Sequence, residues 1–485
     1  MGRRSRPSVC IRPSVADVDG YTTAPFDIQS GPVPSRRIGS PRQSGASHAG
    51  SRRIGCVRGG QPTLLQTLKQ NGYYVWWGGK NDLVPAQDGF DAHCDRRFTP
   101  TPEDYARWGH EPRPGLHAWT EWRGDPEGDN YYSFYAGRLD TGDDDIYCDS
   151  DWANVFGAID FLKSYSGDQP LCIYLPLTYP HPPYGVEEPW YSRISRERMP
   201  PRIPADRPTG SAPKPKILDA IREGQRMHGW DEDRFAELRA TYYGMCARVD
   251  AQFGLVLDAL RDAGIYDDTA VFFFSDHGDF TGDYDLVEKT QNTFEDVLCR
   301  VPFIVKAPTS AGGKPLNSHA GVKNALVELV DFPATVFDLL GIEPGYRHFG
   351  ISLVPLMTGA AESHRNEVHC EGGRLPGEEE AMERPSLEAY DDPSKSLYYP
   401  RSRLQGSDND VWHTKATMIR TSRYKYVRRL YEHDELYDLE VDPGETKNVI
   451  DDASVSGVVV DLKERMLDWY QRTCDVVPYD LDRRS

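Results

Sequence analysis

The sequence predicts an α/β protein with a doubly wound, largely parallel sheet flanked by helices, followed by a smaller C-terminal α+β subdomain. Three stretches, at residues 62–83, 150–184 and 240–279, each run from an amphipathic or capped helix through a short apolar strand into a polar loop. This order is typical of parallel sheets with helices on both faces. After residue 360 the pattern changes to short strands and one closing helix.

Each unit has recognisable boundaries. In the first, a run of leucines shares one helix face, Asn71 and Gly72 end the helix, and Tyr73–Trp77 is the predicted strand. The second has a capped helix from about Trp152 and a strand over Leu171–Leu177 that runs into a proline-rich loop. Both strands therefore end in polar loops that can carry functional side chains.

The third unit is a long amphipathic helix that ends at Gly264, followed by the apolar run "VFFF" and the polar string "SDHGD". Beyond it, two segments rich in proline, glycine or charge, 207–216 and 372–396, are expected to be mobile inserts. Antiparallel strands and a helix over about 454–472 follow. We therefore predict a basic segment at 1–60, an α/β domain at 61–359 and a subdomain at 360–485.

Composition limits the partners. The 485 residues carry a formal charge of −19, so most of the surface repels nucleic acid and anionic lipid. Apolar runs are far shorter than the roughly 18 residues that a membrane span needs, so we expect a soluble protein. Nine cysteines, an odd number without a C-x-x-C pair, are typical of reduced thiols and favour a cytoplasmic location. The sequence does not indicate an oligomeric state.

The first 60 residues differ from the rest of the chain. They contain ten arginines and three aspartates but no lysine, glutamate or leucine, so their charge is +7, and the whole-chain value of −19 leaves −26 on the remainder. Three interpretations fit this change. The segment is a disordered basic arm, an arginine-rich transit peptide, or the product of a shifted reading frame in a GC-rich gene. No secretory signal follows the initial "MGRRSR".

Five side chains that can do chemistry follow predicted strands. They are Lys80 in "GGKNDL", His181 in "YPHPPY", Asp276 and His277 in "SDHGD", and Lys289 in "VEKTQN". Because ligands bind at the carboxyl edge of parallel strands, we expect these side chains to lie close together.

This set of side chains suits the hydrolysis of an anionic ester. A carboxylate beside an imidazole can hold a divalent cation, while two lysines and a histidine can surround a tetrahedral anion such as sulfate or phosphate. His181 could then protonate the leaving oxygen. Motifs for serine hydrolases, P-loops, zincins and dinucleotide binding are absent from the sequence, and the acidic string at 140–151 is interpreted as a solvated loop with a helix cap rather than a calcium site.

The chain resembles the sulfatases, a branch of the alkaline-phosphatase-like hydrolases, over about residues 61–450. The similarity rests on several strings in the same order as in that family, among them "TLLQTLKQNGYYVWWGGKNDL", "YLPLTYPHPPY", "VFFFSDHGDFTGDYDLVEKTQN", "HFGISLVPLMTG" and "ELYDLEVDPGETKNV". It implies hydrolysis of a small-molecule sulfate ester at a divalent-metal site.

The resemblance also implies roles for the five residues. Asp276 and His277 match metal-binding positions, Lys80 and Lys289 match lysines that contact sulfate, and His181 matches the histidine at the ester oxygen. One divalent metal is implied, Ca²⁺, Mg²⁺ or Mn²⁺; since imidazole is a poor ligand for Ca²⁺, His277 favours Mn²⁺ or another transition metal. Position 82, often histidine in the family, is aspartate here, which puts an orienting role at that position in doubt.

The N-terminus departs from the family. Sulfatases begin with a strand, two adjacent metal-binding aspartates and a C-x-P-S-R motif whose cysteine becomes formylglycine, the nucleophile. The string nearest to that motif, "PVPSR" at 32–36, has Pro32 in place of the cysteine, and neither Cys10 nor Cys56 has Pro and Arg at the required spacing. The resemblance therefore predicts a sheet that lacks its first strand and a chain that, as written, cannot form the nucleophile.

Three hypotheses follow. The first is a sulfatase-family hydrolase whose N-terminal portion has been replaced, for example by a frameshift, and which is inactive as written. The second is a non-catalytic relative that binds anionic ligands through Lys80, Lys289 and His181. The third is a phosphodiesterase or phosphonate monoester hydrolase, because an Asp–His metal pair also suits phosphoryl transfer.

Overall fold

A computed structural model of the chain describes residues 8–13, 27–29, 62–84, 86–206, 208–378, 396–405 and 410–474. Its centre is a six-stranded sheet in the order β10-β8-β1-β6-β3-β4, in which all neighbouring strands are parallel except the antiparallel pair β10 and β8. The strands are β1 (Ser8–Pro13), β3 (Tyr74–Trp77), β4 (Arg96–Arg97), β6 (Leu171–Tyr174), β8 (Thr269–Phe274) and β10 (Phe303–Lys306).

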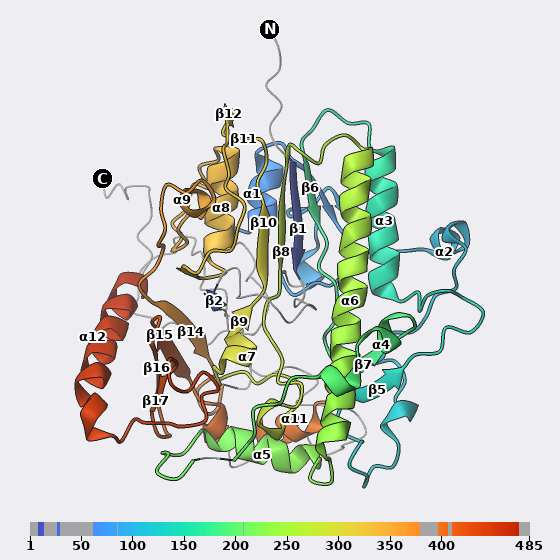
Figure 1. Cartoon of the computed structure of the whole chain (residues 1–485). Helices are drawn as coiled ribbons and strands as arrows, with labels where there is room; N and C mark the ends of the chain where they lie inside the picture. Colours follow the sequence, from blue (N-terminus) through green and yellow to red (C-terminus); the bar gives the residue numbers. More distant parts are fainter. Residues whose placement is uncertain are drawn as a thin grey trace.

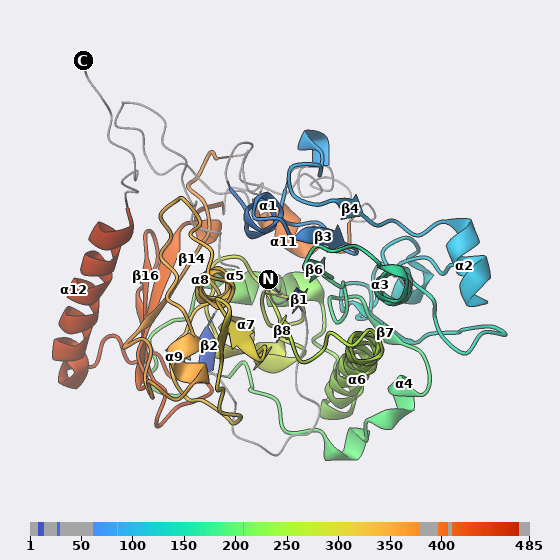
Figure 2. The ribbon, with the colours of Figure 1, turned by 90° about the horizontal axis from the view of Figure 1, so that it is seen from above.

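Helices cover both faces of this sheet (Figures 1 and 2). One face carries α3 (Ser150–Ser164) and the long α6 (Glu232–Asp262), and the other carries α1 (Leu64–Gln70) and α8 (Asp331–Leu340). The architecture is therefore a doubly wound, largely parallel α/β sheet, as the sequence predicts.

The central strands are buried on both faces, which explains their continuous apolar sequence. Along β8, Val271 and Phe273 pack in the core on the α3 and α6 side, whereas Phe272 and Phe274 pack with α1 and α8. Successive side chains of a strand point to opposite faces, so an apolar run without alternation fills two cores at once. All six residues of β8 are buried.

The expectation that the sheet lacks its first strand is wrong. Ser8–Pro13 forms β1 in the middle of the sheet, parallel to both neighbours, with Cys10 opposite Val271 of β8 and Ile173 of β6. The average composition of the basic segment concealed this strand. The short string "SVCIRP" contains the β-branched residues Val9 and Ile11, which favour a strand, and strand pairing uses backbone groups that every segment has. The remaining positions of 1–61, apart from 27–29, lie outside the described residues; these include Pro32 and Cys56.

A second sheet lies in the C-terminal part. It is antiparallel, in the order β14-β15-β16-β17, and α12 packs on it through Leu462 and Met466. This strand and helix pattern agrees with the sequence prediction. The elements are β14 (Val368–Gly372), β15 (Ala416–Arg420), β16 (Tyr424–Arg429), β17 (Glu435–Asp438) and α12 (Ser456–Thr473).

The remaining elements are short. Small sheets pair β2 (Asp27–Gln29) with β9 (Arg300–Val301) and β13 (Leu326–Val327), β5 (Tyr135–Arg138) with β7 (Tyr184–Val186), and β11 (Ser310–Ala311) with β12 (Lys314–Pro315). The other helices are α2 (Pro102–Trp108), α4 (Trp190–Arg193), α5 (Lys216–Gln225), α7 (Asp296–Cys299), α9 (Val354–Met357) and α11 (Tyr399–Gln405). In Figure 1, α5 and α11 lie beneath the central sheet.

Buried ion pairs join the C-terminal sheet to the α/β part. Lys425 of β16, whose side chain is 1 % exposed, donates from Nζ to Glu445 Oε1 at 2.6 Å and to the Phe294 carbonyl at 2.8 Å, and it also pairs with Asp296 of α7. Burial and the nearby acid Asp296 raise the pKa of Glu445 to about 7 although Lys425 opposes this shift. The pair network is therefore one unit shared by both parts of the chain.

The segment 208–216, expected to be a mobile insert, is held in place. The buried Lys214 Nζ lies 3.0 Å from Glu295 Oε1, and the Ala212 amide donates to the Asn448 carbonyl at 2.9 Å. Prolines and glycines in a sequence indicate only the backbone conformation. They could not show that the side chain of Lys214 is buried and paired with an acid. Of the other expected insert, 379–395 lies outside the described residues.

Among the described residues, no helix is long and apolar enough to cross a membrane.

Candidate active site

The loops that follow β3 and β6 are tied together at the carboxyl edge of the sheet. Gly79 has φ +92°, and a Cβ on it would lie 2.0 Å from the Pro176 carbonyl oxygen, so no larger side chain fits there. The next residue, Lys80, donates its amide to the same carbonyl at 2.9 Å. This close backbone approach places Lys80 beside the loop that carries His181.

The loop with His181 is held by the start of α3. The buried Asp151 carboxylate accepts the backbone N–H groups of Thr178 at 2.9 Å and of Tyr179 at 2.8 Å. The Tyr179 ring lies 4.0 Å below the guanidinium of Arg248. From the sequence, the acidic string at 140–151 is interpreted as a solvated loop with a helix cap. The cap is confirmed at Asp149, but the string is not wholly solvated, because its last carboxylate, Asp151, positions a candidate site loop.

His181 and Lys289 meet directly. Lys289 Nζ lies 3.0 Å from His181 Nε2, and His181 Nδ1 lies 2.7 Å from the Pro182 carbonyl oxygen. Because a carbonyl only accepts, Nδ1 carries the proton and Nε2 accepts from the ammonium. Burial, and then the charges of Lys289 and Lys80, hold the pKa of His181 well below its ordinary value. His181 is thus a neutral acceptor, and the transferable proton of this pair is on Lys289.

Asp276 and His277 lie at the end of β8. His277 Nε2 is 3.8 Å from Asp276 Oδ1, and His277 Nδ1 is 2.8 Å from the Gly278 carbonyl oxygen. By the same reasoning, the lone pair of His277 lies on Nε2, the nitrogen nearer to the carboxylate. The Asp276 side chain is 66 % exposed. Although desolvation opposes it, the pKa of Asp276 lies below its ordinary value because of the neighbouring His277 and lysines.

All five residues singled out from sequence come together. The His181 and His277 rings are 6.4 Å apart between centroids, His181 contacts Lys289, and the charge of Lys80 acts on both His181 and Asp276. Asp82, at the position where histidine was considered, pairs with Lys80 at 2.7 Å. Asp82 therefore partly neutralises the charge of Lys80, whereas a histidine at this position would have added an imidazole to the site.

The prediction that Lys289 follows a strand is wrong. It lies in a long loop between β8 and α7, beyond the single turn at Asp283–Asp285. Four residues of this loop other than glycine have left-handed backbone conformations, a strained state that persists only where the surroundings hold it. They are Thr281, Tyr284, Asp285 and Glu288.

A buried network holds the residue before Lys289. Glu288 donates its amide to the Tyr184 hydroxyl at 2.9 Å, and that hydroxyl donates to Asp279 Oδ1 at 2.7 Å. The Glu288 carboxylate lies 3.0 Å from Arg401 Nη1 and 3.1 Å from Lys289 Nζ. Burial raises the pKa of Asp279 to about 6 although Tyr184 donates to it. Sequence reasoning missed this network, because its members come from three separate segments: Tyr184, the loop between β8 and α7, and Arg401.

Two further rings beside the site were also missed. The His117 ring lies 5.9 Å from that of His181, and the Tyr398 ring lies 6.3 Å from it. His117 is an isolated histidine in "GLHAW", and Tyr398 follows a low-complexity stretch, so neither carried a signal in the sequence.

Within the part of the chain that the structure describes, no three His, Cys, Asp or Glu side chains form a group that could hold a metal ion. The fit for a cation is therefore partial. Asp276 offers a carboxylate and His277 offers the Nε2 lone pair on the same side, which are donors that suit a divalent transition metal.

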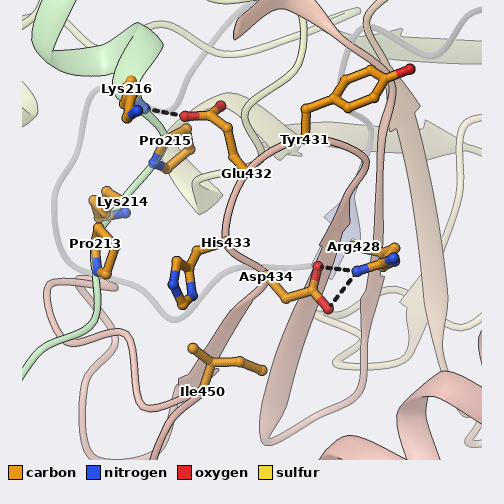
Figure 3. A pocket seen from close by; sticks show the side chains of 10 residues that line it. All are labelled: Pro213, Lys214, Pro215, Lys216, Arg428, Tyr431, Glu432, His433, Asp434 and Ile450. Atoms are coloured by element: carbon orange, nitrogen blue, oxygen red, sulfur yellow. Dashed lines mark hydrogen bonds and ion pairs between the residues drawn. The ribbon is translucent and has the colours of Figure 1, made fainter. Parts of the chain in front are cut away.

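A pocket lies away from the five candidate residues. It lies between residues 213–216 and 428–434, and Figure 3 shows its charged side chains. Arg428 pairs with Asp434 at 2.9 Å, the Lys216 amide donates to Glu432, and Lys214 pairs with Glu295. The charges of Arg428, Asp434 and Lys214 are therefore matched within the protein.

His413, on the turn Asp410–His413, gives a prediction about stability. It is 1 % exposed, and burial together with Arg401 and Arg374 lowers its pKa to about 3. The pKa of an unfolded histidine is near 6.5. Between that pH and about 3, the unfolded chain therefore binds a proton at this position and the folded chain does not, so the free energy of unfolding falls as the pH falls.

At pH 5 this costs about 2 kcal/mol relative to neutral pH. We expect the wild type to lose that much more unfolding free energy between pH 7.5 and 5.0 than the His413→Leu variant, measured by urea denaturation. The exposed His319→Leu is the matched control and should follow the wild type. Equal losses in wild type and His413→Leu would contradict the prediction.

Comparisons with known proteins agree with this fold and site. A family model described as "Sulfatase" matches residues 39–342, and one described as "N-sulphoglucosamine sulphohydrolase, C-terminal" matches residues 387–472. The resemblance therefore begins before residue 61, where the sequence analysis placed its start; residues 39–61 lie outside the described residues.

Individual relatives are distant. The multifunctional alkaline phosphatase superfamily protein PehA of Trinickia caryophylli is 29 % identical over 327 residues, 64 % of this chain and 57 % of PehA. Arylsulfatase K of Xenopus laevis is 23 % identical over 422 residues, 81 % of this chain and 65 % of that protein. Both alignments span less than two thirds of the relative's length.

Among solved structures, the phosphonate monoester hydrolase of Agrobacterium radiobacter superposes with a TM-score of 0.64 over 96 % of both chains at 18 % identity, which shows a shared fold. The sulfatase model covers more than half of the chain, on the same elements that carry Lys80, His181, Asp276, His277 and Lys289. The protein therefore belongs to the sulfatase family, whose members hydrolyse sulfuric esters.

Proposed function

We propose that this chain recognises the sulfate group of a small-molecule sulfate ester at the carboxyl edge of its central sheet. The observation that carries the proposal is the 3.0 Å contact between Lys289 Nζ and His181 Nε2, with the charge of Lys80 acting on the same imidazole. Lys289 and Lys80 bring two ammonium groups to one neutral imidazole, although Glu288 pairs with Lys289 at 3.1 Å and Asp82 pairs with Lys80 at 2.7 Å. A tetrahedral anion would take these ammonium groups as hydrogen-bond donors, in competition with the two carboxylates.

Lys289 is the group best placed to act on the ester. It is 15 % exposed and already shares its proton with His181. When an ester oxygen becomes negative as its bond to sulfur breaks, Lys289 can donate to it directly, or His181 can pass on a proton received from Lys289. This modifies the sequence hypothesis, in which His181 alone was the proton donor.

Asp276 and His277 offer two donors for a divalent metal beside this pair. They would hold it through a carboxylate oxygen and Nε2, and no third His, Cys, Asp or Glu side chain of the described residues joins them in a group that could hold a metal. When bound, the cation would withdraw electron density from the sulfate oxygens. The imidazole favours Mn²⁺ or another transition metal over Ca²⁺ or Mg²⁺.

For the chain as written, we propose binding without turnover. Its sequence offers Pro32 where a C-x-P-S-R motif would have the cysteine that becomes formylglycine, and proline has no group that can be oxidised to an aldehyde. The charge of −19 and the seven free cysteines of the described residues support a small-molecule ligand and a cytoplasmic location.

A second candidate is hydrolysis or binding of a phosphonate monoester or phosphodiester. Two observations favour it: the fold is shared with a phosphonate monoester hydrolase, and the two candidate metal ligands are an aspartate and a histidine. Phosphate and sulfate esters have the same tetrahedral shape and differ chiefly in charge.

The test is a binding and turnover assay of the full chain. Calorimetry would measure the Kd of inorganic sulfate, 4-nitrophenyl sulfate, bis(4-nitrophenyl) phosphate and a 4-nitrophenyl phosphonate ester, each with Mn²⁺, Ca²⁺ or Mg²⁺, while absorbance follows release of nitrophenol. We expect sulfate ester binding without release. Release from the sulfate ester would overturn the absence of turnover, tighter binding of the phosphorus esters would favour the second candidate, and no binding would overturn the site.

The metal is checked in the same assay. A metal that binds only the folded chain raises its melting temperature. Asp276→Asn should reduce the rise that Mn²⁺ causes, whereas Asp258→Asn, at an exposed position of α6, should keep it. Equal rises in both variants would remove Asp276 from the metal site.

A further inference from the structure

Two buried cysteines meet where α7 packs on the C-terminal sheet. Cys299 is the last residue of α7 and Cys370 is the middle residue of β14, and the two are 0 % and 2 % exposed. Their thiols hydrogen-bond to each other, and neither is part of a disulfide in the structure. Both belong to one apolar cluster, which also contains Leu298 of α7 and Met418, the residue opposite Cys370 on β15. The contact therefore lies inside the packed interface between α7 and the sheet.

The segments that carry the two cysteines are fixed by other groups. At the start of α7, Asp296 pairs with Arg420 of β15 at 3.3 Å and accepts from the Lys425 ammonium of β16. At the end of β14, Gly372 lies so close to the Gln291 carbonyl that a Cβ on this residue would overlap the oxygen. The two thiols are thus held against each other by contacts that do not involve sulfur.

The pair is protected from reaction while the chain is folded. Burial, and then the hydrogen bond and charge of Cys370, raise the pKa of the Cys299 thiol well above its ordinary value, although the Lys425 ammonium opposes this shift. Because the thiolate and not the thiol attacks a disulfide, the buried pair reacts slowly. It can react during folding, or when the contact between α7 and β14 opens.

We propose that Cys299 and Cys370 are a disulfide site that closes when the chain meets a thiol oxidant such as glutathione disulfide. The thiolate of one cysteine attacks a sulfur of the oxidant and releases one glutathione, and the second cysteine then displaces the other glutathione. The two cysteines lose two electrons and two protons, and glutathione disulfide becomes two glutathione thiols. In a reducing compartment, the same cysteines remain thiols.

The bond cross-links the C-terminal sheet to a backbone that supports the candidate active site. The Leu298 carbonyl, directly before Cys299, accepts from the Gly278 amide at 2.8 Å. Gly278 directly follows Asp276 and His277 in the sequence. A disulfide at Cys299 therefore restrains the segment on which the loop after β8 rests.

Peptide mapping tests the site. The full chain is treated with glutathione disulfide, either folded or during refolding from urea in a glutathione redox buffer, and free thiols are then blocked with N-ethylmaleimide. Mass spectrometry of the digested chain should show a cross-linked peptide pair that contains Cys299 and Cys370, formed faster during refolding than in the folded chain. If both cysteines carry only the blocking group or separate glutathione adducts after refolding, the proposal is overturned.

The melting temperature tests whether the fold accommodates the bond. The bond closes a loop of about 70 residues, so it should raise the melting temperature of the chain by at least about 3 °C. Reduction with tris(2-carboxyethyl)phosphine should reverse the rise. A cross-link that leaves the melting temperature unchanged, or lowers it, would overturn the inference that the folded segments place the two sulfur atoms for a bond.

Single-cysteine variants are the controls. Cys370→Ala removes the partner of Cys299, so the oxidant should neither cross-link Cys299 nor change the melting temperature; Cys299→Ala repeats the test from the other side. Cys246→Ala removes a cysteine of α6 that is 1 % exposed, and it should show the same rise as the wild type. A rise that persists in both variants of the pair would assign it to other cysteines and overturn the proposal. None of these measurements uses the candidate active site, so their result is independent of the proposed function.

Discussion

Replacing Lys289 by alanine is expected to weaken the binding of inorganic sulfate and of sulfate esters at least about 30-fold, which corresponds to about 2 kcal/mol. The ammonium is only 15 % exposed, so its attraction to an anion is little screened by water. The variant also leaves His181 Nε2 without the donor that it has at 3.0 Å. Calorimetric Kd values for wild type and variant would measure the loss.

The control for this variant is Lys163→Ala, at an exposed position in the last turn of α3. It removes the same charge from the chain without touching the site, and its affinity for sulfate should equal that of the wild type. Thermal unfolding of both variants shows whether a loss of affinity reflects loss of fold. An unchanged Kd in a folded Lys289→Ala protein would remove Lys289 from the anion site.

The second large effect is on stability. Lys425→Met is expected to lower the free energy of unfolding by about 3–5 kcal/mol, because it leaves the buried Glu445 carboxylate without its ammonium partner and takes one cation from Asp296, which keeps Arg420 at 3.3 Å. Lys425 and Glu445 are each 1 % exposed at the side chain, and Asp296 of the same network is 19 % exposed. Since Asp296 and Lys425 lie in different parts of the fold, the variant should weaken the contact between the C-terminal sheet and α7.

Urea denaturation at pH 7.5 would measure this change. Lys463→Met is the control: it removes a lysine that is 48 % exposed and pairs with Asp434 at 3.4 Å, and such surface pairs contribute less than about 1 kcal/mol. A loss for Lys425→Met that is no larger than that of the control would show that water reaches the network and that the acids are not buried in solution.

The helix and strand units of the α/β part could be predicted because their signals are local. The helix face of leucines, the stop at Asn71 and the strand after it agree with α1 and β3 to within one residue. β8 likewise agrees with the run "VFFF". Hydrophobic periodicity and helix caps depend on residues that are close in sequence, so a single sequence is enough to recognise them.

β1 was missed for the opposite reason. The composition of sixty residues was taken as evidence against any strand within them, yet Ser8–Pro13 pairs with β6 and β8 along its length. A strand is stabilised by its neighbours in the sheet, and those neighbours lie more than 150 residues away. The composition of a local segment cannot predict pairing with strands so far away in the sequence.

By itself, the sequence determined the α/β class, the family, and the five residues Lys80, His181, Asp276, His277 and Lys289 that the structure brings to one edge of the sheet. Only the tertiary structure decided that the transferable proton of the His181 pair lies on Lys289, and that His117 and Tyr398 flank it. Motifs indicate the chemical types of side chains. The position of a proton and the side chains that flank a site depend instead on distances between residues far apart in the chain.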